Sequence, residues 1–406
     1  MPLKRVLVVG GSVAGLRAVE TLRQQGYDGE LFLIGAEPHL PYDRPPLSKQ
    51  VLTGEIDVQQ LPYRDAAWFA QNQIELCLGC EAKGLDLGAK RIQAGTRWLA
   101  YDGLILATGS RPCNLPTRGR LTGIHTLRTL DDALAIKAQI LPGTRVVIIG
   151  SGFIGAEVAS SAAACGAQVT ILEASAAPLV RAVGIRLGDA LGRIHDEHGV
   201  TLVCNARVVG FGGKAHVETV RLEDGWIFPA DLVVVGIGVV PNVEWLAGSG
   251  LHIANGLICD ETLNVGHDDV FAAGDVVSWP NRWSGAMVRG EQWMVAADQG
   301  RHAASNLLLG RSHASSFSTI PYFWSDQYGC RIQAAGRTDI GEMVALSGDE
   351  FSRPFVALYR HVGKFVGAVA VNAPKAFAVL RQQLQQHAEV EQAIAMVRKH
   401  LPASDR

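Results

Sequence analysis

The sequence predicts an α/β protein with two Rossmann-like nucleotide-binding domains and a C-terminal α+β domain. Two observations support the paired domains. Gly-rich turns occur at residues 10–15 (Gly-Gly-Ser-Val-Ala-Gly) and 150–155 (Gly-Ser-Gly-Phe-Ile-Gly). Each turn follows an apolar, β-branched run, at residues 6–9 and 146–149, and precedes a stretch rich in Ala, Leu and Glu. This order of strand, turn and helix is typical of dinucleotide binding, so we expect two nucleotides in one chain.

Length and composition limit the class of protein. A chain of 406 residues is expected to form two to four domains, and 45 Gly suit an α/β fold with many tight turns. The net charge of −2 and the lack of a Lys/Arg block argue against nucleic-acid binding. Residues 1–5 lead straight into a strand without a signal peptide, and apolar runs such as 232–240 are too short to span a membrane. We therefore expect a cytoplasmic protein.

The 7 cysteines are scattered, which suits a reducing compartment. Only Cys77 and Cys80 form a C-x-x-C motif, within a run at 74–80 that we interpret as a strand. Strand positions three apart face opposite sides, and no Lys, Arg or His within the motif lowers a thiol pKa. We interpret both as inert thiols, with a metal or redox role as the alternative, and expect no metal site.

The order of patterns along the chain predicts a discontinuous first domain, 1–111 and 236–314, around a second domain at 112–235. From residue 315 to 406 the composition changes, which predicts a third, α+β domain. We expect helices at 15–25 and 375–400, and strands at 31–34, 104–106, 168–172, 232–235, 270–273, 355–360 and 364–371.

The glycines of each turn have separate tasks. The first permits a tight bend, the last lets helix and strand pack closely, and the helix N-terminus faces a pyrophosphate. The second turn has all three glycines in register, whereas the first has Ser12 in the middle. The expected pyrophosphate residues are Gly10, Ser12, Val13, Ala14 and Gly15 in the first turn, and Gly150, Gly152, Phe153, Ile154 and Gly155 in the second.

Three acids are placed to bind hydroxyl groups. Glu173 ends the second strand of the second unit, where a carboxylate accepts from an adenine-ribose 2′-OH and repels a 2′-phosphate, so we predict NADH over NADPH. Glu37 is the corresponding candidate in the first unit, with a solvated loop acid as the alternative. Asp275 follows a buried strand and could accept from a ribityl hydroxyl of a flavin. Its alternative role is a helix N-cap.

Several motifs together resemble one family. They are Arg44-Pro45-Pro46-Leu47-Ser48-Lys49, Ala107-Thr108-Gly109, Leu127-Arg128-Thr129-Leu130, Gly236-Ile237-Gly238, Gly274-Asp275 and Phe323-Trp324-Ser325-Asp326-Gln327. Over almost its whole length the chain resembles FAD-dependent ferredoxin reductases that serve Rieske oxygenases and bacterial cytochromes P450. The resemblance implies a glutathione-reductase-like flavoprotein with FAD on the first domain, NAD(H) on the second, and a C-terminal interface domain.

The resemblance also implies roles for residues at matching positions. It places Ala14, Arg44, Lys49, Ala82, Ala107, Thr108, Gly109, Arg128, Gly274, Asp275 and Trp293 at FAD, and Glu157, Gly236, Ile237 and Gly238 at NAD. Lys49 would lie near the isoalloxazine, and Glu157 near the nicotinamide, with a favourable acid at a helix N-terminus as its alternative role. Trp324 would lie at the flavin edge that faces ferredoxin, with core packing as its alternative. The family often has Asp where Ala36 stands, and the carboxylate of that Asp hydrogen-bonds the ribose. The resemblance therefore implies that in this chain the ribose hydrogen bond has moved to Glu37 or been lost.

The absence of thiols from one segment shapes the expected function. Residues 1–76 contain no Cys, so the pair near the flavin that disulfide reductases need is missing. We therefore expect hydride from NADH to reach FAD, and single electrons to pass to a [2Fe-2S] ferredoxin, with the enzyme a monomer or weak homodimer. Candidates for steering the acidic ferredoxin are Arg289, Arg301, Arg311 and Arg331, with solvated surface charge as the alternative.

Two other functions stay open at this point. One is reduction of another one-electron acceptor, such as rubredoxin or monodehydroascorbate, because acceptor choice depends on surface shape. The other is an NAD-responsive signalling flavoprotein of the apoptosis-inducing-factor type.

Overall fold

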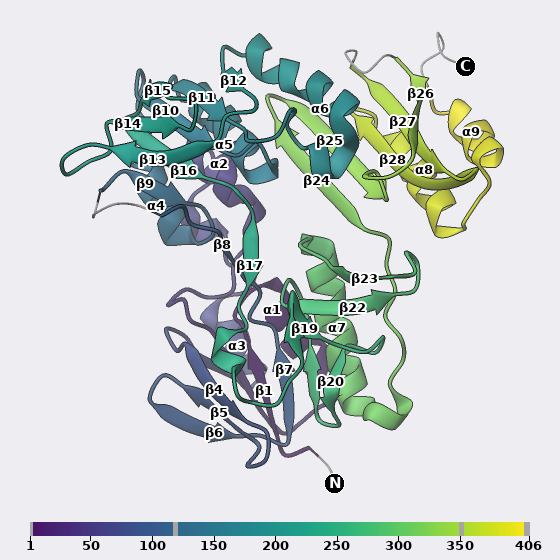
Figure 1. Cartoon of the computed structure of the whole chain (residues 1–406). Helices are drawn as coiled ribbons and strands as arrows, with labels where there is room; N and C mark the ends of the chain where they lie inside the picture. Colours follow the sequence, from purple (N-terminus) through teal and green to yellow (C-terminus); the bar gives the residue numbers. More distant parts are fainter. Residues whose placement is uncertain (1–2, 117–120, 349–352, 402–406) are drawn as a thin grey trace. The chain divides into compact units, whose positions relative to one another are not determined.

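The computed structural model describes residues 3–116, 121–348 and 353–401, and Met1 and Pro2 before the first strand lie outside these ranges. The chain forms two compact units (Figure 1). The first unit comprises Met1–Asp43, Gln59–Arg111 and Val239–Pro321, and the second comprises Arg44–Val58, Pro112–Gly238 and Tyr322–Arg406.

The first unit is built on a 6-stranded sheet with the order β20-β21-β7-β1-β2-β3. Its central strands are parallel, with Leu7 of β1 paired to Leu104 of β7 and to Phe32 of β2. The strands are β20 (Asn264–His267), β21 (Val270–Ala272), β7 (Gly103–Leu106), β1 (Arg5–Val9), β2 (Glu30–Ile34) and β3 (Ile74–Cys77). The helices α1 (Val13–Gln24) and α7 (Trp293–Leu309) accompany this sheet.

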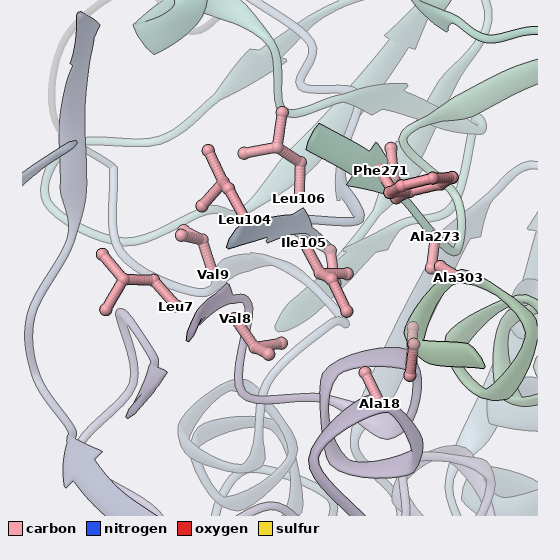
Figure 2. Packing of buried hydrophobic residues seen from close by; sticks show 14 of the residues in the cluster. Leu7, Val8, Val9, Ala18, Leu104, Ile105, Leu106, Phe271, Ala273 and Ala303 are labelled. Carbon is pink, nitrogen blue, oxygen red and sulfur yellow. The ribbon is translucent and has the colours of Figure 1, made fainter. Parts of the chain in front are cut away.

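The core of the first unit lies between this sheet and its helices (Figure 2). Leu7, Ile105 and Phe271 are fully buried, because parallel strands covered on both faces need continuous apolar sequence. The helices α1 and α7 pack very closely, since a Cβ atom at Gly300 would lie 2.2 Å from the carbonyl oxygen of Ala14. Small residues at this contact therefore fix the helix that follows the first Gly-rich turn.

Smaller elements complete the first unit. One antiparallel sheet contains β4 (Ala82–Asp86), β5 (Arg91–Ala94) and β6 (Arg97–Ala100). Another contains β18 (Ile253–Ala254), β19 (Gly256–Ile258), β22 (Val277–Asn281) and β23 (Ala286–Arg289). The helix α3 (Ala66–Gln71) begins at Asp65, whose side chain accepts a hydrogen bond from the Trp68 amide.

The second unit repeats the arrangement around its own 5-stranded sheet, with the order β12-β11-β10-β16-β9. The strands are β12 (Thr201–Val203), β11 (Gln168–Leu172), β10 (Arg145–Ile149), β16 (Leu232–Val235) and β9 (Ile124–Thr126), all parallel. The helices are α2 (Gln50–Thr53), α4 (Leu130–Lys137), α5 (Phe153–Ala164) and α6 (Val180–Glu197). A small sheet of β13 (Val208–Gly212), β14 (Thr219–Leu222) and β15 (Ile227–Pro229) accompanies them. In both units the central strand leads into a Gly-rich turn, and the next strand lies directly beside it.

The C-terminal part of the second unit is a 5-stranded antiparallel sheet, in the order β24-β25-β28-β27-β26. Its strands are β24 (Tyr322–Gln327), β25 (Cys330–Gly336), β28 (Lys364–Val371), β27 (Phe355–His361) and β26 (Glu342–Ser347). Leu187 and Ile194 of α6 share a buried cluster with Ile332 and Tyr359 of this sheet. The sheet and α6 therefore form one continuous core.

The predicted fold class is confirmed, with two corrections to its elements. The predicted helix at 375–400 is wrong, because α8 (Pro374–Gln385) and α9 (Val390–Arg398) are separated by His387 in a left-handed conformation with φ of 50°. The predicted strand at 74–80 is also wrong, because β3 ends at Cys77 and the chain turns at Leu78 and Gly79. Within the ranges that the structure describes, no helix has the length and apolar character that a membrane crossing requires.

Candidate functional site

The first Gly-rich turn is packed against the end of a neighbouring strand. Gly10 has φ of +127°, and a Cβ atom there would lie 1.9 Å from the carbonyl oxygen of Ala107, just after β7. A Cβ atom at Gly15 would lie 1.9 Å from the carbonyl oxygen of Gly10. Ser12 is the N-cap residue of α1, followed by buried Val13 and Ala14. The turn is therefore held in the shape that presents a helix N-terminus to a phosphate.

The second turn has the same construction. Gly150 has φ of +96° and would place a Cβ atom 2.5 Å from the carbonyl oxygen of Gly236, just after β16. A Cβ atom at Gly155 would lie 2.1 Å from the carbonyl oxygen of Gly150. At Gly152 the nearest atom to a Cβ would be the Gly236 oxygen at 4.0 Å. Packing within the protein thus explains the outer glycines, and the space at Gly152 suits the close approach of a phosphate.

Other predicted residues lie around this second turn. Phe153 and Ile154 begin α5, and the Phe153 ring lies 4.3 Å from that of Phe323 on β24. After Gly236, the chain continues through Ile237 and Gly238, whose carbonyl oxygen accepts from the Cys113 amide at 2.9 Å. The structure therefore brings the predicted NAD residues together at the carboxyl end of β10 and β16.

Glu173 lies just after β11 and is directed at the turn. Its Oε2 accepts from both the amide and the hydroxyl of Ser151, each at 2.7 Å, and its Oε1 accepts from the Ser175 amide at 2.7 Å. Burial raises the pKa of Glu173, but these hydrogen bonds outweigh it and leave the pKa below its usual value. The carboxylate is therefore a fixed, ionised acceptor, which suits a ribose hydroxyl.

Glu157 on α5 joins three separate segments of the second unit. Its Oε2 accepts from the Ser48 hydroxyl at 2.6 Å and from Lys49 Nζ at 2.7 Å. Its Oε1 accepts from the Ser325 hydroxyl of β24 at 2.8 Å. The first turn of α5 contains no acidic residue, so the alternative of a helix N-terminal acid does not describe Glu157. Its carboxylate is instead the acceptor of a buried ion pair with Lys49.

Trp324 precedes Ser325 on the same strand, and successive strand residues face opposite sides. Its ring stacks on Tyr322, with centroids 5.9 Å apart and an interplanar angle of 23°. Trp324 is half-buried, whereas Ser325 is fully buried. One short strand therefore presents an aromatic ring on one face and holds Glu157 from the other.

Asp275 is held in the first unit by a serine hydroxyl. Ser110 Oγ donates to Asp275 Oδ2 at 2.7 Å, and the preceding Gly274 amide donates to Gln299 Oε1 of α7 at 2.8 Å. The element after Asp275 is the strand β22, so the alternative role of a helix N-cap is wrong. Gln299 Nε2 is buried without a hydrogen-bond partner among the residues that the structure describes, and such a donor suits a bound group at this position.

The other predicted residues of the first unit lie at the carboxyl ends of its strands or nearby. Glu37 accepts from the Tyr42 hydroxyl at 2.6 Å, and Ala36 is exposed. Trp293 Nε1 donates to Asp43 Oδ1 at 3.1 Å and lies 2.9 Å from the Tyr63 hydroxyl.

Three more of these residues lie on or after strands. The Thr108 hydroxyl donates to the carbonyl of Asn242, whose amide donates to the Gly109 carbonyl, each at 2.9 Å. Ala82 begins β4.

Three residues predicted at FAD lie in segments of the second unit. These are Arg44, Lys49 and Arg128. A guanidinium nitrogen of Arg44 donates to the carbonyl oxygen of Arg128 at 2.5 Å, and the Arg128 amide donates to Asp132 Oδ2 at 3.0 Å. The loop that carries Arg128 and the Pro-rich segment are therefore joined within one unit.

The arginines predicted to steer a protein partner are each paired with an acid. The pairs are Arg289–Glu291 at 2.5 Å, Arg301–Asp298 at 2.7 Å, Arg311–Asp268 at 3.3 Å and Arg331–Asp326 at 3.8 Å. The Arg289 side chain is only 10% exposed. In each pair the acid offsets the positive charge of the arginine, and this charge is what the attraction of an acidic ferredoxin requires.

Sequence reasoning missed the residues that orient the acids. Ser151 holds Glu173, Ser325 and Ser48 hold Glu157, and Ser110 holds Asp275. Ser151 lies within the Gly-rich turn, and its small polar side chain was the one signal available. In the ranges described, no three His, Cys, Asp or Glu side chains gather as metal ligands.

Two sheets with parallel central strands, each followed by a Gly-rich turn at the carboxyl end of its central strand, form the arrangement that is typical of dinucleotide-binding oxidoreductases. The model of the family Pyridine nucleotide-disulphide oxidoreductase matches residues 4–300, and the Reductase C-terminal model matches residues 322–399. The chain belongs to the pyridine nucleotide-disulphide oxidoreductase family.

Relatives share this full-length organisation. The ferredoxin–NAD(+) reductase component of an anthranilate 1,2-dioxygenase system from Burkholderia cepacia is 39% identical, over 93% of each chain. A rubredoxin–NAD(+) reductase from Pseudomonas putida is 32% identical, over 91% of this chain and 96% of the relative.

Solved structures show the same fold. A ferredoxin reductase for the CYP199A2 system from Rhodopseudomonas palustris has a TM-score of 0.91 and 33% identity, over 96% of this chain and 97% of that one. Putidaredoxin reductase, solved in a covalent complex with putidaredoxin, has a TM-score of 0.90 and 29% identity, over 97% of this chain and 98% of that one. The resemblance predicted from the motifs is confirmed.

Proposed function

We propose that the chain is an NADH-dependent ferredoxin reductase that takes hydride from NADH onto FAD. Single electrons then pass to a [2Fe-2S] ferredoxin that feeds a cytochrome P450 or Rieske oxygenase. The observation that carries this proposal is the buried Lys49–Glu157 pair in a chain whose first 76 residues contain no cysteine. A disulfide relay has no residues to use there, and relatives named for ferredoxin reduction match along the whole chain.

The proposal includes the three predicted domains. Residues 1–111 and 236–314 would bind FAD, residues 112–235 would bind NADH, and residues 315–406 would form the interface domain. The two Gly-rich turns support this division, because each has the outer glycines fixed by packing and a helix that begins beside them.

The chain's own residues would bind and orient the nucleotides. The turn at Gly10 and Gly15 suits the FAD pyrophosphate, and Asp275, oriented by Ser110, suits a ribityl hydroxyl. Lys49 and Glu157 would hold a fixed pair of charges near the reacting rings. When bound, the flavin supplies the exchange between two-electron and one-electron chemistry.

The same proposal selects NADH over NADPH. Glu173 is ionised and is fixed by Ser151 and Ser175, so it would repel a 2′-phosphate and accept a hydrogen bond from a 2′-hydroxyl. A ribose hydroxyl would replace the Ser151 hydroxyl as a hydrogen-bond donor to Glu173. NADPH turnover equal to NADH turnover would contradict this part.

The acceptor is tested by rapid mixing. The holoenzyme is reduced with NADH under anaerobic conditions and mixed with ferredoxin, rubredoxin or ascorbyl radical in a stopped-flow instrument. Fast reoxidation by ferredoxin alone supports the proposal. Fast reoxidation by rubredoxin favours the second candidate, which the 32% identical rubredoxin reductase motivates. Slow reoxidation by all three indicates a signalling flavoprotein.

A substitution at Trp324 tests the proposed route of electrons from the flavin to ferredoxin. We expect Trp324→Ala to slow ferredoxin reduction and to leave NADH-dependent ferricyanide reduction unchanged, because a small acceptor does not need the protein-docking edge. An equal loss with both acceptors would show that Trp324 serves the β24 packing instead. Tyr322→Phe, which keeps the stacked partner ring, is the matched control.

A further inference from the structure

Cys77 and Cys80 form a pair that none of the proposed steps uses. Cys77 ends β3, Leu78 and Gly79 form a turn, and Gly79 has φ of +67°, as the third position of a type II turn requires. A β-turn keeps its first and fourth Cα atoms within about 7 Å. A disulfide spans Cα atoms about 4.4–6.8 Å apart, so the turn already has a suitable separation.

The turn places the two thiols at its first and fourth positions. Burial, followed by the charges of the Cys80 and Glu75 side chains, raises the pKa of Cys77. Both residues are half-buried, so small reagents can reach them, whereas Cys259 and Cys330 are buried. The expectation that both residues lie on one strand is wrong, because β3 ends at Cys77, so the alternation of strand faces does not extend to Cys80.

We propose that Cys77 and Cys80 are a dithiol site that hydrogen peroxide oxidises to an intramolecular disulfide. One thiolate attacks peroxide and becomes a sulfenic acid, with release of hydroxide. The second thiol attacks that sulfur, the S–S bond forms and the S–O bond breaks, with release of water. In total, two thiols and one peroxide give one disulfide and two waters, and the two electrons pass from sulfur to peroxide.

The backbone links this pair to the loop of Glu37. The Gly35 amide donates to the Cys77 carbonyl at 2.9 Å, and the Cys80 amide donates to the Gly35 carbonyl at 2.8 Å. The Gly79 amide donates to the Glu37 carbonyl at 2.9 Å. A disulfide restricts the turn and so stabilises the segment bonded to it. This consequence depends on the fold alone and not on the proposed electron acceptor.

Peptide mapping tests the oxidation. The full-length holoprotein is treated with hydrogen peroxide or with a thiol reductant, its free thiols are alkylated, and its peptides are analysed by mass spectrometry. We expect a Cys77–Cys80 peptide that has lost two hydrogens and carries no label, and its reversal by reductant. Cys113→Ser and Cys204→Ser are matched controls that retain the disulfide. Separate alkylation of both thiols after peroxide, or sulfinic acid without disulfide, would overturn the proposal.

Two further measurements do not depend on peroxide chemistry. Phenylarsine oxide bridges neighbouring thiols, so native mass spectrometry should show one adduct that Cys77→Ser and Cys80→Ser both abolish. Failure of the wild-type protein to form the adduct would contradict the geometry. Hydrogen exchange at Gly35, Gly79 and Cys80 should slow several-fold on oxidation. Unchanged exchange in a fully oxidised sample would refute the link to the Glu37 loop.

Discussion

Lys49 Nζ lies 2.7 Å from Glu157 Oε2, and the two side chains are 14% and 7% exposed. A carboxylate buried to this extent needs several donors, and Ser48 and Ser325 supply two more. The ion pair thus depends on three segments: the Pro-rich segment, α5 and β24. This arrangement makes Glu157 sensitive to changes in any of them.

Removing the charge of Glu157 should be costly. Glu157→Gln keeps the shape but leaves the Lys49 ammonium buried without its counter-charge, so we expect a loss of about 3 kcal/mol in the free energy of unfolding. Urea denaturation of the wild type and the variant measures this difference. Ser325→Ala keeps the Lys49–Glu157 pair but removes a hydroxyl donor to the carboxylate and the acceptor of Gln327 Nε2, so it should cost less, about 1.5 kcal/mol. Equal losses in the two variants would show that the charge is unimportant.

The second and third glycines of the second turn, Gly152 and Gly155, should respond differently to alanine. Gly155→Ala would place a Cβ atom 2.1 Å from the Gly150 carbonyl oxygen, so we expect destabilisation of about 3 kcal/mol. Gly152→Ala meets no protein atom closer than 4.0 Å, so stability should change by less than about 0.5 kcal/mol. NADH binding, measured by fluorescence titration, should nevertheless weaken at least tenfold in Gly152→Ala. Unchanged NADH affinity in that variant would show that no phosphate of NADH binds close to Gly152.

Coenzyme choice should depend on Glu173 and, less strongly, on Ser151. Glu173→Ala removes both the acceptor and the repulsion, so we expect the NADH KM to rise about tenfold and the preference over NADPH to shrink. Ser151→Ala retains the backbone donor to the carboxylate and should raise the NADH KM only about two- to threefold. Steady-state kinetics with both coenzymes, together with binding titrations, measure the two effects. A larger effect of Ser151→Ala than of Glu173→Ala would contradict this order.

His195 should make stability depend on pH. It is 2% exposed on α6 and hydrogen-bonds the Tyr328 hydroxyl at 2.8 Å. Burial, and secondarily the charge of His198, lowers the pKa of His195 to about 4. The unfolded chain takes up this proton near pH 6.5, so stability should fall by about 3 kcal/mol as pH drops from 6.5 to 4.

Urea denaturation at a series of pH values checks this dependence. His195→Gln retains a hydrogen-bonding side chain without a titrating ring, and its stability should lose that part of the pH dependence. A wild-type slope that persists in His195→Gln would assign the effect to other groups.

The pattern of residues was enough to predict the strand, Gly-rich turn and helix at the centre of both units. A strand, a Gly-rich turn and a helix that follow one another each leave a pattern in the local sequence, so they can be predicted from it. The strands β11 and β16 have the predicted bounds. The same local reasoning predicted one helix where the structure has α8 and α9, because the composition gives no sign of the left-handed backbone conformation of His387. It also extended β3 to Cys80, although the strand ends at Cys77 and the two cysteines lie at the ends of a turn.

The residue pattern was enough to predict the fold class and to single out Glu173, Glu157 and Asp275 as candidate acids, and it shows that residues 1–76 contain no thiol pair. The contacts between distant segments were needed to show which donors hold those acids. Ser151, Ser325 and Ser110 are ordinary serines along the chain, and each becomes a partner through contact with a distant segment. Sequence patterns report periodicity and local turns, whereas a hydrogen bond between remote segments depends on how close sheets and helices bring them.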